Sequence, residues 1–175
     1  HSEQENNVYI ICRSIPNSLS NHFENGIKLK SFKDQRSSFL IDVKTCNYLF
    51  NFICLYEAKK TDFDDVLFKD HESFYSECAT SSLIWFDKSF NVHSYPLGAS
   101  VLSGTSLAAF IKKLNQTKIK FSFDKFSEKD MNNNCIGAAA ISSVRGFVSV
   151  QKIDDICFDL NKYKDFFIEL ENILK

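Results

Sequence analysis

The 175-residue sequence contains little of what usually marks an active site. It has five Gly, two Pro, one Trp and one Met. The Gly residues form neither GxxxxGKS/T nor GxGxxG, the two patterns in which backbone N–H groups cradle phosphates. GxSxG, the nucleophile elbow of serine hydrolases, is absent as well. These absences exclude the common nucleotide-binding and serine-hydrolase motifs.

Metal ligands are also poorly arranged. The four His are not spaced with the Cys residues as zinc sites require, and there is no CxxC. The acidic pairs Asp64-Asp65 and Asp154-Asp155 lack the alternating carboxylates and the turn Gly of a calcium loop. The sequence therefore predicts no metal, no cofactor and no enzymatic activity.

Charge excess and long apolar runs are missing too. The net charge is −1, whereas proteins that bind nucleic acid or anionic membranes need a basic excess. The longest weakly polar stretch, 136–144, is far shorter than the roughly 20 residues that span a bilayer. The sequence therefore predicts no nucleic-acid partner and no membrane span.

What the sequence does contain is six cysteines, an even number spread along the chain. They are Cys12, Cys46, Cys54, Cys78, Cys135 and Cys157. This usage favours disulfides and an oxidising compartment, with all 15 pairings left open. The alternative is buried free cysteines in a cytosolic protein.

The first two residues bear on the compartment. The chain opens His1-Ser2 without an initiator Met, as a tag scar or a processed terminus would leave it. We therefore expect a signal peptide outside the sequence given, and secretion or display on the cell surface.

Two amphipathic helices are the clearest structural signals. In 161–175 six large apolar residues recur at helical spacing, opposite a charged face. They are Tyr163, Phe166, Phe167, Leu170, Ile173 and Leu174. A second helix is predicted over 105–116, with Thr105 or Ser106 as its N-cap.

Most other segments show the alternation or the aromatic and β-branched runs of strands. These segments are 8–12, 27–32, 39–46, 48–56, 82–86, 90–95, 99–102, 118–126, 135–142, 144–151 and 156–160. Residues 57–77 are predicted to form an exposed connection, and 127–134 a loop. The fold class is α+β, with a mainly antiparallel, disulfide-stabilised sheet. We expect one compact domain over 1–175, or two fused subdomains with a seam near 57–80.

A basic cluster suggests a ligand site. Lys28, Lys30, Lys33 and Arg36 lie on a predicted strand and the turn after it. A strand, a basic loop and a long C-terminal helix resemble the pleckstrin-homology arrangement, which implies binding of inositol phosphates or their lipids. The alternative is a solvated edge strand.

The Phe-, Asn-, Lys- and Ile-rich composition, with its dispersed cysteines, resembles small secreted proteins of malaria parasites, such as secreted ookinete proteins. This resemblance implies a non-enzymatic surface antigen that binds an extracellular protein or a host or vector surface. Asn115-Gln116-Thr117 is in addition a glycosylation sequon. The pleckstrin-homology-like lipid module is the alternative function.

Overall fold

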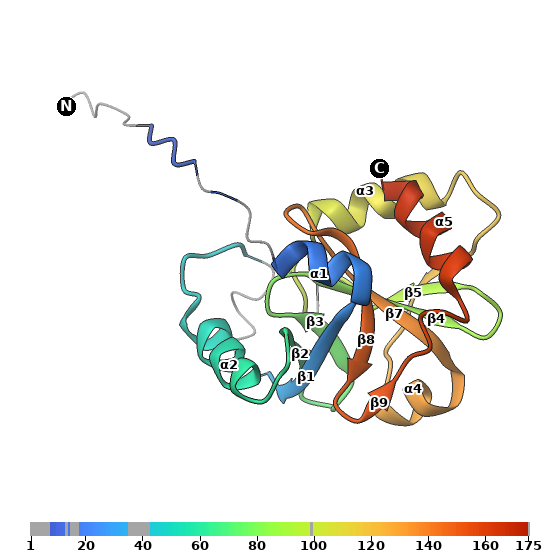
Figure 1. Ribbon diagram of the computed structural model, residues 1–175, viewed down its shortest axis with the longest axis horizontal. Helices are drawn as coiled ribbons and strands as arrows, with labels where there is room; N and C mark the ends of the chain where they lie inside the picture. The colour runs from blue at the N-terminus through green and yellow to red at the C-terminus, as the bar shows by residue number, and fades with distance from the viewer. Residues whose placement is uncertain (1–7, 13, 15–17, 35–42, 99, 175) are drawn as a thin grey trace.

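The computed structural model describes residues 8–12, 14, 18–34, 43–98 and 100–174 (Figure 1). Six strands form its centre: β1 (Ile27–Lys33), β2 (Asp65–Lys69), β3 (Tyr75–Cys78), β4 (Ser82–Asp87), β7 (Cys135–Ser142) and β8 (Gly146–Ile153). They follow the order β3-β2-β1-β8-β7-β4, and pairing of β3 with β4 closes them into a barrel. Three short strands extend the sheet: β5 (Val92–Ser94), β6 (Phe121–Phe123) and β9 (Ile156–Cys157).

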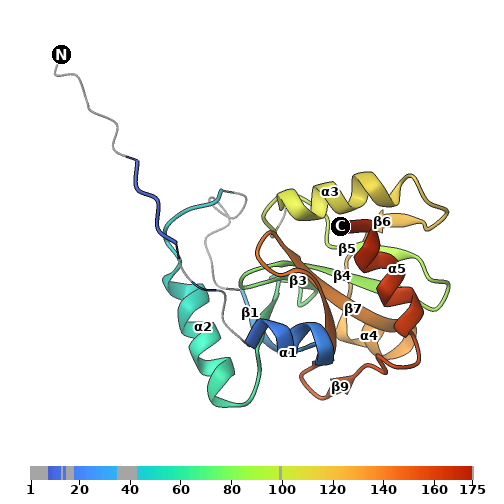
Figure 2. The ribbon, with the colours of Figure 1, turned by 45° about the horizontal axis from the view of Figure 1, so that its top comes forward.

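Five helices surround the barrel: α1 (Ser18–Asn25), α2 (Leu49–Lys60), α3 (Thr105–Leu114), α4 (Glu128–Asn134) and α5 (Lys164–Leu174). Helices α3 and α5 lie side by side, while α2 covers a different side of the barrel against β2 (Figure 2). Helix α1 packs on β8, and α4 packs on β7.

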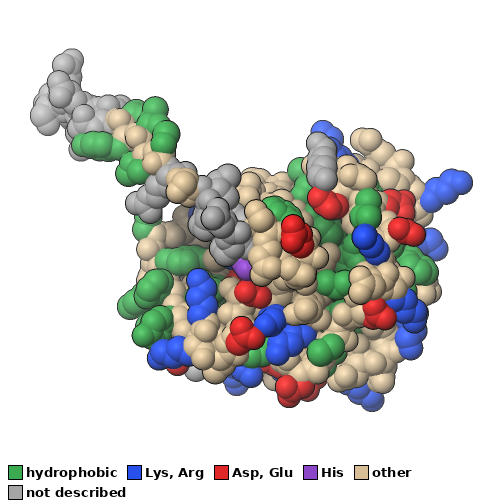
Figure 3. All heavy atoms as spheres, in the orientation of Figure 1, with side chains coloured by type: hydrophobic (Ala, Val, Ile, Leu, Met, Phe, Trp, Pro, Cys, Tyr) green, Lys and Arg blue, Asp and Glu red, His purple; other side chains and the backbone are tan. Residues whose placement is uncertain are grey.

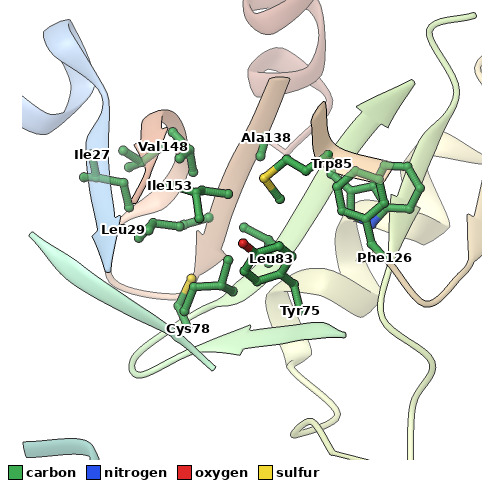
Figure 4. Close-up of a cluster of buried hydrophobic side chains, with 14 residues drawn as sticks. Ile27, Leu29, Tyr75, Cys78, Leu83, Trp85, Phe126, Ala138, Val148 and Ile153 are labelled. Carbon is green, nitrogen blue, oxygen red and sulfur yellow. The ribbon is translucent and has the colours of Figure 1, made fainter. Parts of the chain in front are cut away.

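The largest core cluster gathers residues from all six barrel strands. Figure 4 shows Leu29, Leu83 and Val148 converging with the aromatic rings of Tyr75 and Trp85. All five side chains are at least nine-tenths buried. Apolar residues on alternate positions of each strand therefore fill the barrel.

The predicted terminal helix is confirmed as α5. Its residues Phe167 and Leu170 are buried against α3 and the sheet. A Cβ added to Gly137 on β7 would come within 2.7 Å of Cζ of Phe167. Gly137 therefore lets the ring of Phe167 lie directly on the backbone of the sheet. The other predicted helix, 105–116, is confirmed as α3.

The strand predicted at 48–56 is wrong, because this segment is helix α2. Asn51, Cys54 and Ala58 are buried on one face, while a second apolar stripe on the helix is exposed. The stripe consists of Leu49, Phe52, Ile53 and Tyr56. Figure 3 shows hydrophobic side chains gathered on this side of the molecule. With apolar residues on both faces, the helical period is hidden in the sequence.

The mainly antiparallel sheet is also a wrong prediction, for a related reason. β1 pairs in parallel with both β2 and β8. Neighbouring parallel strands need a crossover connection, and α2 provides it between β1 and β2. Because residues 48–56 were predicted as a strand, the crossover was not predicted. The parallel pairs and the closed, mixed barrel were therefore not predicted either.

Several further segments differ from their predicted structures. Of the strand predicted at 99–102, residues 100–102 are not in a strand, and residue 99 lies outside the described residues. Residues 57–77 hold the end of α2 and much of the buried strands β2 and β3, although their many charges suggested an exposed connection. Residues 128–134 form α4, whose start is fixed by a capping box between Ser127 and Asp130. Residues 8–12 are exposed and form no strand. Of the strand predicted at 39–46, residues 39–42 lie outside the described residues, and 43–46 are not in a strand. The strands predicted at 135–142 and 144–151 are confirmed as β7 and β8, which pair as an antiparallel hairpin.

The predicted disulfide stabilisation is wrong as well, since none of the six cysteines is in a disulfide. Cys54 and Cys78 are buried in two different apolar clusters. Burial raises the pKa of the Cys135 thiol to about 12 and the pKa of Cys78 well above its usual value. These thiols serve as small apolar core residues, the alternative that the sequence left open.

Candidate active site

A cavity of about 770 Å³ opens at one end of the barrel, where four stretches of the chain meet. Its lining residues lie within 43–51, 77–82, 102–107 and 141–143. The second stretch joins β3 to β4, the third begins α3, and the fourth ends β7. The cavity is thus built by loops at strand and helix ends.

Two charged side chains face this cavity. Lys44, just before α2, is the only amine among the described residues that line it, and Glu77 on β3 is the only carboxylate. Glu77 is 6% exposed, and its Oε2 accepts a hydrogen bond from the Leu102 N–H at 3.0 Å. The carboxylate is therefore held in one orientation, whereas Lys44 is exposed at the cavity wall.

The first turn of α3 forms another wall. Gly104 is the N-cap, and no side chain caps this end of the helix. The first N–H groups of a helix have no partner within it, and they carry a partial positive charge that favours anions. A Cβ on Gly104 would lie 2.8 Å from Oγ of Ser82, so a larger residue there would require the Ser82 hydroxyl to move. The turn therefore offers N–H donors, with the hydroxyls of Thr105 and Ser106 beside them.

The segment that carries Lys44 is tied to the strand that carries Glu77. The Tyr48 hydroxyl and the Asn51 side-chain amide both donate to the carbonyl oxygen of Ala79, the amide at 2.9 Å. Asn51 is 5% exposed, so this bond is shielded from water. These two bonds fasten the start of α2, which follows Lys44, to the residue two positions after Glu77.

A second hollow, of about 330 Å³, lies beside β4 and β5. Its His93 stacks on Trp85, with ring centroids 4.0 Å apart. Nε2 of His93 lies 3.2 Å from Asp87, and Nδ1 lies 2.9 Å from both Asp124 and the Ser122 hydroxyl. Both ring nitrogens of His93 are thus engaged by neighbouring side chains. This arrangement is a structural tie between β4, β5 and β6.

The two aspartates make the stability of this corner depend on pH. Burial raises the pKa of Asp87, but hydrogen bonds from Asn91 and His93 outweigh it and leave the pKa below its usual value. Hydrogen bonds from Ser122 and then His93 lower the pKa of Asp124. A carboxyl with a lowered folded-state pKa stabilises above its unfolded pKa of about 3.9 and loses this effect as pH falls.

We therefore expect the melting temperature to fall between about pH 5 and pH 2, and the Asp124→Asn variant to show a shallower fall. Thermal melts followed by circular dichroism at each pH measure this. Asp155→Asn, an exposed aspartate near β9, is the matched control. Equal slopes for Asp124→Asn and the unsubstituted chain would contradict the expectation.

Of the predicted anion-binding residues, Lys28, Lys30 and Lys33 do not line the cavity. Lys28 and Lys30 are on β1, where Lys28 Nζ pairs with Asp62 at 2.6 Å and Lys30 Nζ with Asp154 at 3.4 Å. Lys33 ends the same strand, and Arg36 lies outside the described residues. Anion binding there stays a prediction. Asn115 is the exposed C-cap of α3, and its glycosylation also stays a prediction.

Sequence reasoning missed both Lys44 and Glu77. They are 33 positions apart and belong to no short motif, so nothing local connects them. A weak signal exists in the hydroxyl-rich turns, since Thr80-Ser81-Ser82, Ser103 to Ser106 and Ser142-Ser143 all line the cavity. Several such turns in one chain can indicate a polar ligand site.

The described ranges contain neither a metal-binding cluster nor a membrane-spanning helix. No group of three or more His, Cys, Asp or Glu side chains there is placed to hold a metal ion. None of the described helices combines the length and the apolar character needed to cross a membrane.

Comparison with known proteins gives one family. A family model described as amino-transferase class IV matches residues 1–153. No curated protein sequence matches the chain.

Solved structures share the fold. A hypothetical aminotransferase from Mycobacterium tuberculosis, in its PLP-bound form, is 16% identical with a TM-score of 0.84, over 93% of this chain and 60% of its own. The fold IV-transaminase CpuTA1 from Curtobacterium pusillum is 19% identical with a TM-score of 0.79, over 92% and 55%. A candidate 4-amino-4-deoxychorismate lyase from Legionella pneumophila is 23% identical with a TM-score of 0.76, over 85% and 56%. The chain therefore spans 55 to 60% of the length of these structures.

These matches overturn the resemblance to secreted malaria-parasite proteins, which rested on composition alone. The expected antigen function, the extracellular partner and the lack of enzymatic activity are wrong with it, since the matching family and the three similar structures are those of enzymes. The pleckstrin-homology-like alternative is also wrong, because the barrel has the aminotransferase fold. Secretion or surface display stays a prediction that disulfides no longer support.

Proposed function

The chain belongs to the class IV aminotransferase family, and from this premise we propose that it forms the pyridoxal phosphate (PLP) domain of an enzyme acting on amino groups. The observation that carries the proposal is that Lys44, Glu77 and the first turn of α3 line one cavity. Its volume of about 770 Å³ lies in the range of cofactor and substrate pockets.

The donor set of the cavity fits this cofactor. PLP carries an aldehyde, a phosphate and a ring nitrogen that can be protonated. A lysine amine can bond to the aldehyde, a carboxylate can pair with the protonated nitrogen, and a helix N-terminus can bind the phosphate. Lys44, Glu77 and residues Gly104 to Ser106 supply these three groups in turn.

When bound, PLP acts as an electron sink for the carbon that carries the amino group of a substrate. Nζ of Lys44 is the amine that holds the cofactor, and when released it can take a proton from that carbon and return it elsewhere. The Leu102 N–H orients the Glu77 carboxylate, which would hold the ring nitrogen of the bound cofactor in its protonated form. The polar turns around both residues orient substrate and cofactor.

Transfer of the amino group to a 2-oxo acid is the reaction we propose, following the family. The 23% identical Legionella protein supports elimination as a second candidate. The two reactions differ in the substrates they need, because transfer consumes an amino-group acceptor and elimination does not. Product formation that requires an added 2-oxo acid would identify transfer.

A titration with PLP tests the proposal. We expect an absorbance change that saturates with added PLP and survives dialysis. We expect pyridoxal to bind at least tenfold more weakly, because it lacks the phosphate that would contact the N-terminus of α3. Equal binding of PLP and pyridoxal would contradict the role of α3. No saturable binding of PLP would overturn the proposed function.

A further inference from the structure

A buried ion pair lies directly behind the cavity wall. The Asp65 side chain at the start of β2 is fully buried, and its Oδ2 accepts from Nη1 of Arg145 at 2.9 Å and from Oγ1 of Thr80 at 2.7 Å. Oδ1 of Asp65 accepts from the Val66 N–H at 2.7 Å. One carboxylate therefore binds two separate turns of the chain.

Both turns contribute to the cavity, although Asp65 and Arg145 do not line it. Thr80 belongs to the turn between β3 and β4, and Ser142 and Ser143 lead into the turn between β7 and β8. Arg145 lies three residues after Ser142, and its N–H donates to the Ser142 hydroxyl at 3.2 Å. The ion pair thus acts on the cavity only through these neighbours.

The β7–β8 turn is short, and its ends are held by the pairing of Ser142 with Gly146. Only three residues separate the two strands, and Val144 at its tip is 78% exposed. The Arg145 side chain is 18% exposed and reaches inward to Asp65. The strand pairing joins the turn to its own hairpin, whereas the Arg145 side chain fastens it to β2.

We infer that Arg145 and Asp65 are positioning residues that hold the Ser142-Ser143 turn against bound PLP and so set the affinity for the cofactor, an inference that rests on the proposed function. A buried charge left without its partner also destabilises the fold. The test must therefore separate position from stability.

The variants Arg145→Met, Asp65→Asn and the double variant make this separation. Each single change leaves one buried partner unmatched, whereas the double change removes both and recovers part of the melting temperature. We expect the Kd for PLP to rise at least tenfold in Arg145→Met and to stay raised in the double variant. Arg145→Lys, which keeps the charge, is expected to restore part of the affinity and carries the test if Arg145→Met does not fold.

Lys69→Met is the matched control. Lys69 is 21% exposed and pairs with Glu128 at 3.1 Å, away from the lining residues. We expect its Kd for PLP to stay within twofold of the unsubstituted chain. A Kd that recovers with the melting temperature in the double variant would overturn the inference, because the pair would then serve stability alone.

Hydrogen exchange on the cofactor-free protein gives an independent readout. We expect faster exchange in 142–146 and 79–81 for Arg145→Met, and no change there for Lys69→Met. If the unsubstituted chain does not bind PLP, the proposed function and the affinity part of the inference both fail. The exchange measurement still decides whether Arg145 positions the turn, and unchanged exchange would overturn that part.

Discussion

Lys44→Ala is expected to abolish covalent attachment of PLP while leaving the fold intact. Lys44 is exposed, so its removal should change the free energy of unfolding by no more than about 0.5 kcal/mol. No other amine among the described residues lines the cavity, so neither the cofactor bond nor the proton transfer can be taken over. We expect turnover to fall by about 10³-fold or more.

Mass spectrometry after borohydride reduction measures the attachment. The unsubstituted chain should gain the mass of one reduced cofactor, and Lys44→Ala should not. Lys59→Ala is the matched control, because Lys59 is exposed at the far end of α2 and does not line the cavity. A cofactor mass retained on Lys44→Ala would refute the assignment of this lysine.

Glu77→Gln should bind PLP but use it poorly. The amide keeps an oxygen that can accept from the Leu102 N–H, so that donor keeps its partner. It loses the negative charge that would keep the ring nitrogen protonated. By analogy with the loss of one preorganised electrostatic group, we expect turnover to fall about 10²-fold.

The measurement compares turnover and the Kd for PLP in the same preparation. Turnover should fall more than affinity, since the phosphate and aldehyde contacts remain. Glu57→Gln provides the control, because Glu57 pairs with Lys60 on the surface of α2. Unchanged turnover in Glu77→Gln would show that this carboxylate does not face the cofactor ring.

The parts of the fold that could be predicted are those in which one face is apolar and the other polar. The stripe of α5 and the apolar face of α3 satisfy this condition, and both helices are where the sequence places them. Helix α2 does not satisfy it, because Cys54 faces the core while Phe52 and Ile53 face outward. Because α2 was predicted as a strand, the parallel pairing of β1 was not predicted either.

The candidate site could not be predicted from the sequence, for a different reason. Lys44 and Glu77 come together only because α2 crosses from β1 to β2 and the following hairpin returns to the same end of the barrel. Asp65 and Arg145, 80 positions apart, meet in the same way. A single sequence shows residue types at positions, whereas this site depends on barrel closure.

The pairing of β1 has a consequence for how the chain folds. Ile27 pairs with Val150, more than 120 residues later, so one edge of β1 stays open until β8 has been synthesised. At 5–20 residues per second this wait lasts roughly 6–25 s. Such non-local pairing is slow, and an open strand edge is a site of aggregation. The closure that gives the cavity its walls therefore makes the yield of folded protein depend on how well β1 is protected while it waits.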